Sequence, residues 1–289
     1  MARSRLSTLQ KVKAILRHVA PLPPEARTAI GHYWRSAIDQ QNMLNYVRGH
    51  LLGVRNLRAS VRDDYLSDLY AMLMLQAIET LERYFKEVAA VCIDFIGRYI
   101  IDDRFDTFRI QGSSFAAHFG TDTLGRALCE SSTWLDTTTI NSRFRAILSD
   151  SFEDGKFVLF PNGRKDPPAD RERFECLEIV WQLRHTQVHN VGVITQSDAI
   201  KFHLMIREPV ESPRLLVPTR DDIGHLKQFM DETAEIANQR IGTRLAELLT
   251  TIHAGYPTLF APQDMADRVT NAFGVVLSVA GATGVLLPP

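Results

Sequence analysis

The chain has 289 residues, of which 45% are hydrophobic and 23% are charged. These proportions are typical of a globular protein and exclude the disordered, collagen-like and disulfide-rich classes. Three cysteines, Cys92, Cys129 and Cys176, stand far apart and form no CxxC pair. We therefore expect no disulfide framework and no cysteine-based zinc site, and the pattern favours a reducing, cytoplasmic location.

The net charge of −1 hides an asymmetry along the chain. Between Met1 and Arg62 there are eleven basic residues and two acidic ones, which gives this segment a charge of +9 and leaves −10 for the rest. A basic segment can bind phosphate backbones, because cationic side chains neutralise phosphates and release counterions. It can equally dock on the acidic body of this chain or of a second copy.

Apolar residues recur at helical spacing through most of the first half of the chain. The strongest pattern runs from Asp64 to about Ile101 and predicts a long helix at the centre of the core. Further helices are predicted over Leu6–Val19, Glu25 to about Leu52, Leu124–Cys129 and Thr139–Leu148. The first half is therefore expected to be helical.

The second half mixes helical patterns with turn-forming residues. Glycines and prolines mark Ser151–Asp170 as an insertion loop around a β-prone run, Lys156–Phe160. Two apolar runs, Ile200–Ile206 and Arg214–Val217, predict a β-hairpin beside the helices. A last long helix is predicted from about Asp221 to Thr251.

Together these patterns predict an all-α bundle with a small β-hairpin insertion and extra N-terminal helices. We divide it into a basic helical arm (1–61), a helical domain (62–255) and an apolar C-terminal tail (256–289). The uncharged run Ala272–Leu287 is shorter than the roughly 20 residues that a spanning helix needs. We expect it to pack on the body or on a partner, and we expect no membrane contact.

The segment from Arg171 to about Asn190 predicts a helix with an arginine in an unusual place. An apolar stripe runs along one side of this helix and consists of Leu177, Val180, Trp181 and Val188. Arg184 lies within that stripe, and burying a guanidinium is costly unless it is paired. The pattern predicts either a carboxylate partner, such as Glu79 or Glu82, or an anionic ligand.

The opposite side of the same helix carries Glu178, Gln182, His185 and His189 as one polar face. Asn190 and Gly192 predict that the helix ends directly after His189. Residues five apart on a straight helix point about 140° away from each other. Arg184 and His189 can therefore converge only if the helix bends or ends between them, or if a second subunit places its own copy opposite.

The run from Leu183 to Gly192, LRHTQVHNVG, resembles the RxxxxH signature of the HEPN superfamily. In that family a polar residue follows the arginine, an aliphatic residue precedes the histidine, and a small or Asn/Gly-containing turn comes next. The matching residues here are His185, Val188, Asn190 and Gly192. The spacing also occurs at Arg27–His32 and Arg220–His225, but glycine precedes both of those histidines, and we set these pairs aside.

The resemblance extends over about Arg62 to Thr251 and implies an all-helical bundle that cleaves RNA without a metal or another cofactor. The implied reaction is attack of the ribose 2′-hydroxyl on the adjacent phosphate. His189 would move the proton, and Arg184 would hold the phosphate. His185, Glu178 and Asn190 are supporting candidates, of which His185 and Glu178 would orient His189 or contact RNA.

Family membership further implies a homodimer that places two motifs in one cleft, with RNA as substrate. It implies a toxin or antiviral defence effector, restrained by an antitoxin or another regulatory protein. The main alternative is a catalytically silent HEPN-like module for RNA binding or dimerisation. A plainer alternative is a helical protein in which Arg184 is salt-bridged and the histidines are merely exposed.

A metal site is a separate hypothesis, because His185 and His189 are four residues apart and could share an ion with a carboxylate. A zinc protease of the HExxH type requires glutamate where Thr186 stands, so that class is excluded.

Overall fold

The computed structural model describes residues 28–97, 116, 124–130, 134, 136–149, 157–255, 262–273, 278–280 and 285–287. Within these ranges the chain is mostly helical, which confirms the all-α prediction. The predicted helix Leu6–Val19 lies outside the described residues.

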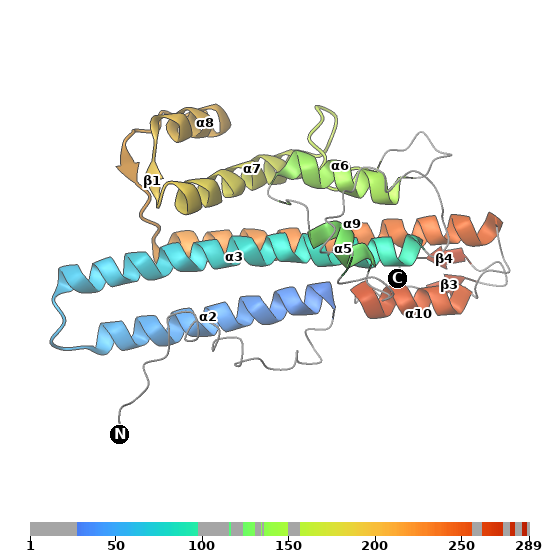
Figure 1. Ribbon diagram of the computed structural model, residues 1–289, viewed down its shortest axis with the longest axis horizontal. Helices are drawn as coiled ribbons and strands as arrows, with labels where there is room; N and C mark the ends of the chain where they lie inside the picture. The colour runs from blue at the N-terminus through green and yellow to red at the C-terminus, as the bar shows by residue number, and fades with distance from the viewer. Residues whose placement is uncertain are drawn as a thin grey trace, which may run out of the picture.

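Four long helices lie alongside one another with α3 at the centre (Figure 1). They are α2 (Ala29–Gly53), α3 (Ala59–Ile96), α7 (Pro168–His189) and α9 (Arg220–Gly255). The shorter helices are α5 (Leu124–Glu130), α6 (Thr137–Leu148), α8 (Gln196–Ile206) and α10 (Pro262–Phe273). Two antiparallel strand pairs complete the described fold, β1 (Val193–Ile194) with β2 (Arg214–Leu215) and β3 (Ser278–Ala280) with β4 (Val285–Leu287).

The central position of α3 follows from its apolar stripe, as predicted. The buried members of that stripe are Leu73, Ile78, Leu81, Phe85, Val88 and Cys92. Helices α2, α5, α6, α7 and α9 all pack against α3. Phe85 meets Phe144 and Phe160 edge-on, with ring centroids 6.4 and 5.8 Å away. Full burial of one such side chain stabilises the fold by about 1.5–3 kcal/mol, so this cluster anchors the bundle.

The start of α7 is tied to the body by polar contacts. Arg240 on α9 donates to the Asp170 carboxylate at 2.6 Å and to the Leu159 carbonyl at 2.9 Å.

The Asn141 side chain bonds both the N–H and the C=O of Phe160. The β-prone run Lys156–Phe160 was expected to form a strand, but residues 157–160 form none. The Asn141 side chain takes the place of a strand partner there. Residues 168–170, predicted as loop, already belong to α7.

The predicted β-hairpin is wrong in one of its two arms. Ile200–Ile206 belongs to helix α8 and not to a strand. Thr195 and Asp198 form a capping box that starts this helix at Gln196. The true partner of β2 is β1, where Val193 faces Leu215.

Both ends of the described chain pack on the bundle. Helix α2 buries Ala29, Tyr33, Ala37 and Leu44 and lies along α3 (Figure 1). Helix α10, within the predicted apolar tail, packs on α9, and the Asn238 side chain donates to the Phe273 carbonyl at 2.6 Å. Among the described helices, none combines the length and the apolar character that crossing a membrane requires.

Candidate functional site

Helix α7 carries the candidate residues, with Asn190 as its C-cap, and its middle turns are fixed against α6. Leu177, Val180 and Trp181 are buried, as the stripe predicts. The Trp181 indole N–H donates to the Thr137 hydroxyl at 3.1 Å, and the Glu178 carboxylate accepts the Thr137 backbone N–H at 3.2 Å. Glu178 therefore stabilises the N-terminus of α6, where a negative charge is favourable.

The apolar stripe of α7 does not continue to its end, so the prediction for Val188 is wrong. Val188 is 41% exposed, because the last turn of α7 extends beyond the core. Other exposed apolar side chains surround this end of the helix. With Val188 they form what we call the motif-end patch: Val188, Val191, Val193 and Leu215.

Arg184 is half-buried one turn before this patch. Its Nε is buried and has no hydrogen-bond partner among the described residues. Glu82, one of the two predicted carboxylate partners, forms an ion pair with Lys86 at 2.8 Å instead. Neither Glu82 nor Glu79 pairs with Arg184 within the described part of the chain. A buried guanidinium nitrogen without an acceptor is costly, and Nε of Arg62, Arg171 and Arg173 is in the same condition among the described residues.

His185 and His189 lie together on the exposed side of α7. Their ring centroids are 4.8 Å apart, with an angle of 46° between the ring planes. The helix ends at His189, as predicted, and Asn190 caps it. No group of three or more histidine, cysteine or carboxylate side chains that could hold a metal occurs among the described residues.

The structure does not bring Arg184 and His189 together within one chain. Both residues belong to the same uninterrupted helix, which continues through His189. The two side chains therefore diverge by about 140° around the helix axis. The helix does not end between Arg184 and His189. A second copy of the chain is therefore the remaining way to bring an Arg184 side chain next to a His189 side chain.

A buried carboxylate behind the histidines was missed by sequence reasoning. Asp198 accepts hydrogen bonds from Gln182 at 2.9 Å and Asn190 at 2.7 Å, and from both the backbone and the hydroxyl of Thr195. It is only 1% exposed. Asn190 thus acts through Asp198 to fix the end of α7 on α8. The Thr-x-x-Asp spacing at Thr195 is a sequence signal for the cap, but nothing nearby in the sequence indicates Gln182.

The charge of Asp198 is stabilised inside this network. Burial by itself raises the pKa of the carboxyl group. The hydrogen bonds from Thr195 and Asn190, together with the nearby His185, outweigh burial and hold the pKa of Asp198 below its ordinary value. A negative charge therefore lies behind the two imidazoles at neutral pH.

The two RxxxxH pairs that were set aside have other surroundings. His32 on α2 contacts Glu87 on α3, with Nδ1 3.0 Å from a carboxylate oxygen. His225 lies on α9 beside the cavity described below. Neither histidine is part of the α7 cluster.

Comparison with known proteins adds nothing to this site. No protein-family profile, no curated protein sequence and no solved structure matches the chain.

Proposed function

We propose that this protein is a metal-independent endoribonuclease that acts as a homodimer. The observation that carries the proposal is the arrangement at the end of α7. Two exposed imidazoles lie 4.8 Å apart, and the same helix carries, on another side, an arginine whose buried Nε has no partner among the described residues. The resemblance of this segment to the HEPN signature supports the same reading.

The residue types suit cleavage through the 2′-hydroxyl. A base must take the proton of the 2′-hydroxyl as its oxygen attacks phosphorus, and an acid must protonate the 5′-oxygen as its bond to phosphorus breaks. His189 serves as the base, and His185 is the nearest group that can serve as the acid. Arg184 binds the phosphate and stabilises the charge that develops on its oxygens. The products are a cyclic phosphate and a 5′-hydroxyl.

A second copy of the chain would solve the divergence of Arg184 and His189. The motif-end patch exposes four apolar side chains at the end of α7 and on the β1–β2 pair that follows it, and apolar surface of this kind marks association sites. The proposal is a two-fold contact at this end of α7 that would bring His189 of each chain to Arg184 of the other. The basic side chains of residues 1–62 can then bind the RNA backbone. In this proposal a separate regulatory protein would restrain the ribonuclease activity.

The test is cleavage of mixed cellular RNA by the purified full chain in excess chelator. We expect the wild type to leave cyclic phosphate ends and His189→Ala and Arg184→Ala to lose activity by about a hundredfold or more. His203→Ala, on α8, is the matched control and should cleave normally, with folding of every variant checked by circular dichroism. Equal cleavage by wild type and both motif variants would refute the site assignment.

The alternative is a silent module for RNA binding or dimerisation. One observation favours it, namely the divergence of Arg184 and His189 along an unbroken helix. In that case the wild type binds RNA without cutting it, and Arg184→Ala weakens binding while His189→Ala does not.

A further inference from the structure

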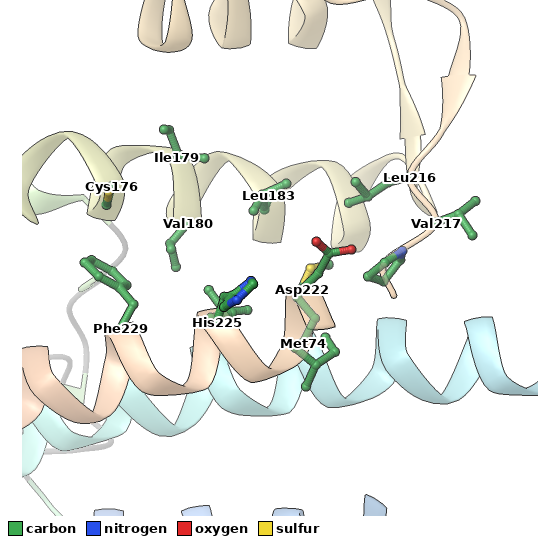
Figure 2. Close-up of a pocket in the computed structure, with 13 residues that line it drawn as sticks. Met74, Cys176, Ile179, Val180, Leu183, Leu216, Val217, Asp222, His225 and Phe229 are labelled. Carbon is green, nitrogen blue, oxygen red and sulfur yellow. The ribbon is translucent and has the colours of Figure 1, made fainter. Parts of the chain in front are cut away.

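A groove lies between α7 and α9, above α3, on a different side of α7 from the histidines. Its volume is about 490 Å³, which falls within the range of small-molecule sites in proteins. Figure 2 shows Val180 and Leu183 projecting from α7 toward Phe229 and His225 on α9. Around the axis of α7, Leu183 and His189 are separated by about 120°, so the groove and the histidine face are distinct.

The lining of the groove is predominantly apolar. Its walls are formed mainly by Met74, Ile179, Val180, Leu183, Leu226 and Phe229. Water gains few hydrogen bonds on such walls, so a ligand with an apolar body is favoured there by the area that it removes from water.

The polar lining of the groove includes one carboxylate, Asp222, and one imidazole, His225. Asp222 lies beside His225 (Figure 2). Thr219 donates to Oδ2 of Asp222 through its backbone N–H at 2.8 Å and its hydroxyl at 2.7 Å. The hydrogen bond from the Thr219 hydroxyl has the larger effect, and together the two hold the pKa of Asp222 below its ordinary value. Oδ1 has no hydrogen-bond partner among the described residues and can accept one from a ligand.

We propose that this groove binds a small amphiphile that has an aliphatic or aromatic body and a primary ammonium head. The body lies against Val180, Leu183 and Phe229, and the ammonium group donates to Asp222. An alcohol of the same length keeps the apolar contacts but loses the charge attraction, and a carboxylate is repelled by Asp222. Binding at this groove does not require ribonuclease activity.

Calorimetric titration of the full chain with decylammonium, decanol and decanoate, each below its micelle concentration, tests the proposal. We expect one saturable site per chain, with decylammonium bound about three- to fivefold more tightly than decanol, because Asp222 is exposed to solvent. Decanoate should bind most weakly. Asp222→Asn keeps an oxygen acceptor for Thr219 and should reduce decylammonium binding to the level of decanol.

A variant that fills the groove separates this site from other surfaces. Leu183→Trp should weaken decylammonium binding at least about tenfold, because the indole occupies the ligand volume. Leu204→Trp is the matched control, since Leu204 is 72% exposed on α8 and does not line the groove. It should leave binding unchanged.

The thiol of Cys176 gives a second readout inside the groove. Cys176 is half-buried and lines the groove, whereas Cys92 and Cys129 are buried. Burial, aided by Glu172 and Glu175, raises the pKa of the Cys176 thiol, so alkylation is followed at mildly alkaline pH. Decylammonium should slow the alkylation of Cys176.

Several results would overturn the proposal. They are the absence of saturable binding, equal affinity for the three probes, and unchanged affinity in Leu183→Trp. Another is a shift of Leu183→Trp from dimer to monomer in sedimentation, which would show that a second copy covers the groove.

Discussion

One buried carboxylate, Asp198, holds the end of the motif helix in place. It joins Gln182 and Asn190 of the α7 segment to the first turn of α8. Removing it leaves two side-chain amides without acceptors in a buried region and breaks the capping box. The position of His185 and His189 relative to α8 therefore depends on a residue outside the RxxxxH motif.

We expect Asp198→Ala to lower the free energy of unfolding by about 2–4 kcal/mol at neutral pH, measured by urea denaturation. The folded-state pKa of Asp198 is lowered, so its contribution is complete above the ordinary carboxyl pKa and is lost as pH falls below that value. The difference between wild type and variant should therefore shrink in acid. Asp221→Ala, at an exposed position, is the control, and an equal effect of both variants would contradict this role.

At this scale the sequence predicted the helical positions of the candidate residues better than their hydrogen-bond partners. Local spacing predicts the positions of Arg184 and His189 on the helix and its stop at Asn190. The Gln182–Asp198 contact joins residues 16 positions apart across a turn, so no local periodicity indicates it. The proposed pairing of Arg184 with Glu82 failed because Lys86, one turn along the same helix, satisfies that carboxylate.

The end of α7 is the element that decides where the histidines point. The chain leaves the helix through two consecutive residues with positive φ, Val191 at 51° and Gly192 at 78°. The N–H groups of Asn190 and Gly192 both donate to the Thr186 carbonyl. Glycine adopts this conformation freely, whereas a β-branched residue such as valine is strained in it.

Opposite effects are expected at these two neighbouring positions. Gly192→Ala should lower the free energy of unfolding by about 1–2 kcal/mol, because the new Cβ would lie 3.0 Å from Oε1 of Gln187 and φ is positive. Val191→Gly should raise it by up to about 1 kcal/mol, because 78% of Val191 is exposed and its strain is released. Thermal denaturation measures both, and a loss of stability in Val191→Gly would contradict the strain assigned here.

Periodicity predicted the long helices and also the short helices α5 and α6, but it did not predict β1 or α8, the two short elements that follow α7. The stripe of α3 extends over many turns, so its core position follows from sequence alone. The run Ile200–Ile206 is short, and apolar runs of that length fit a strand or a helix equally well. The Thr195–Asp198 cap decides for a helix. The apolar stripe of α7 was extended too far, to Val188, because spacing does not reveal where the neighbouring helices end.

At the scale of the whole molecule, the two residues of the proposed site, Arg184 and His189, do not meet within one chain. Arg184 lies on one side of α7, and His189 lies on another side, beside the motif-end patch. In the proposed two-fold dimer, two composite sites would form, each with Arg184 from one chain and His189 from the other. Arg184→Ala and His189→Ala would then damage complementary halves of each site.

Subunit mixing tests this claim most directly. Arg184→Ala and His189→Ala chains are unfolded together, refolded as a mixture, and assayed on mixed cellular RNA in excess chelator beside each variant alone. Half of the randomly formed dimers contain one intact composite site of two, so we predict recovery of about a quarter of wild-type cleavage. Adding Val188→Glu to both variants should abolish that recovery by placing like charges in the contact. A mixture as inactive as either variant alone would contradict the composite site.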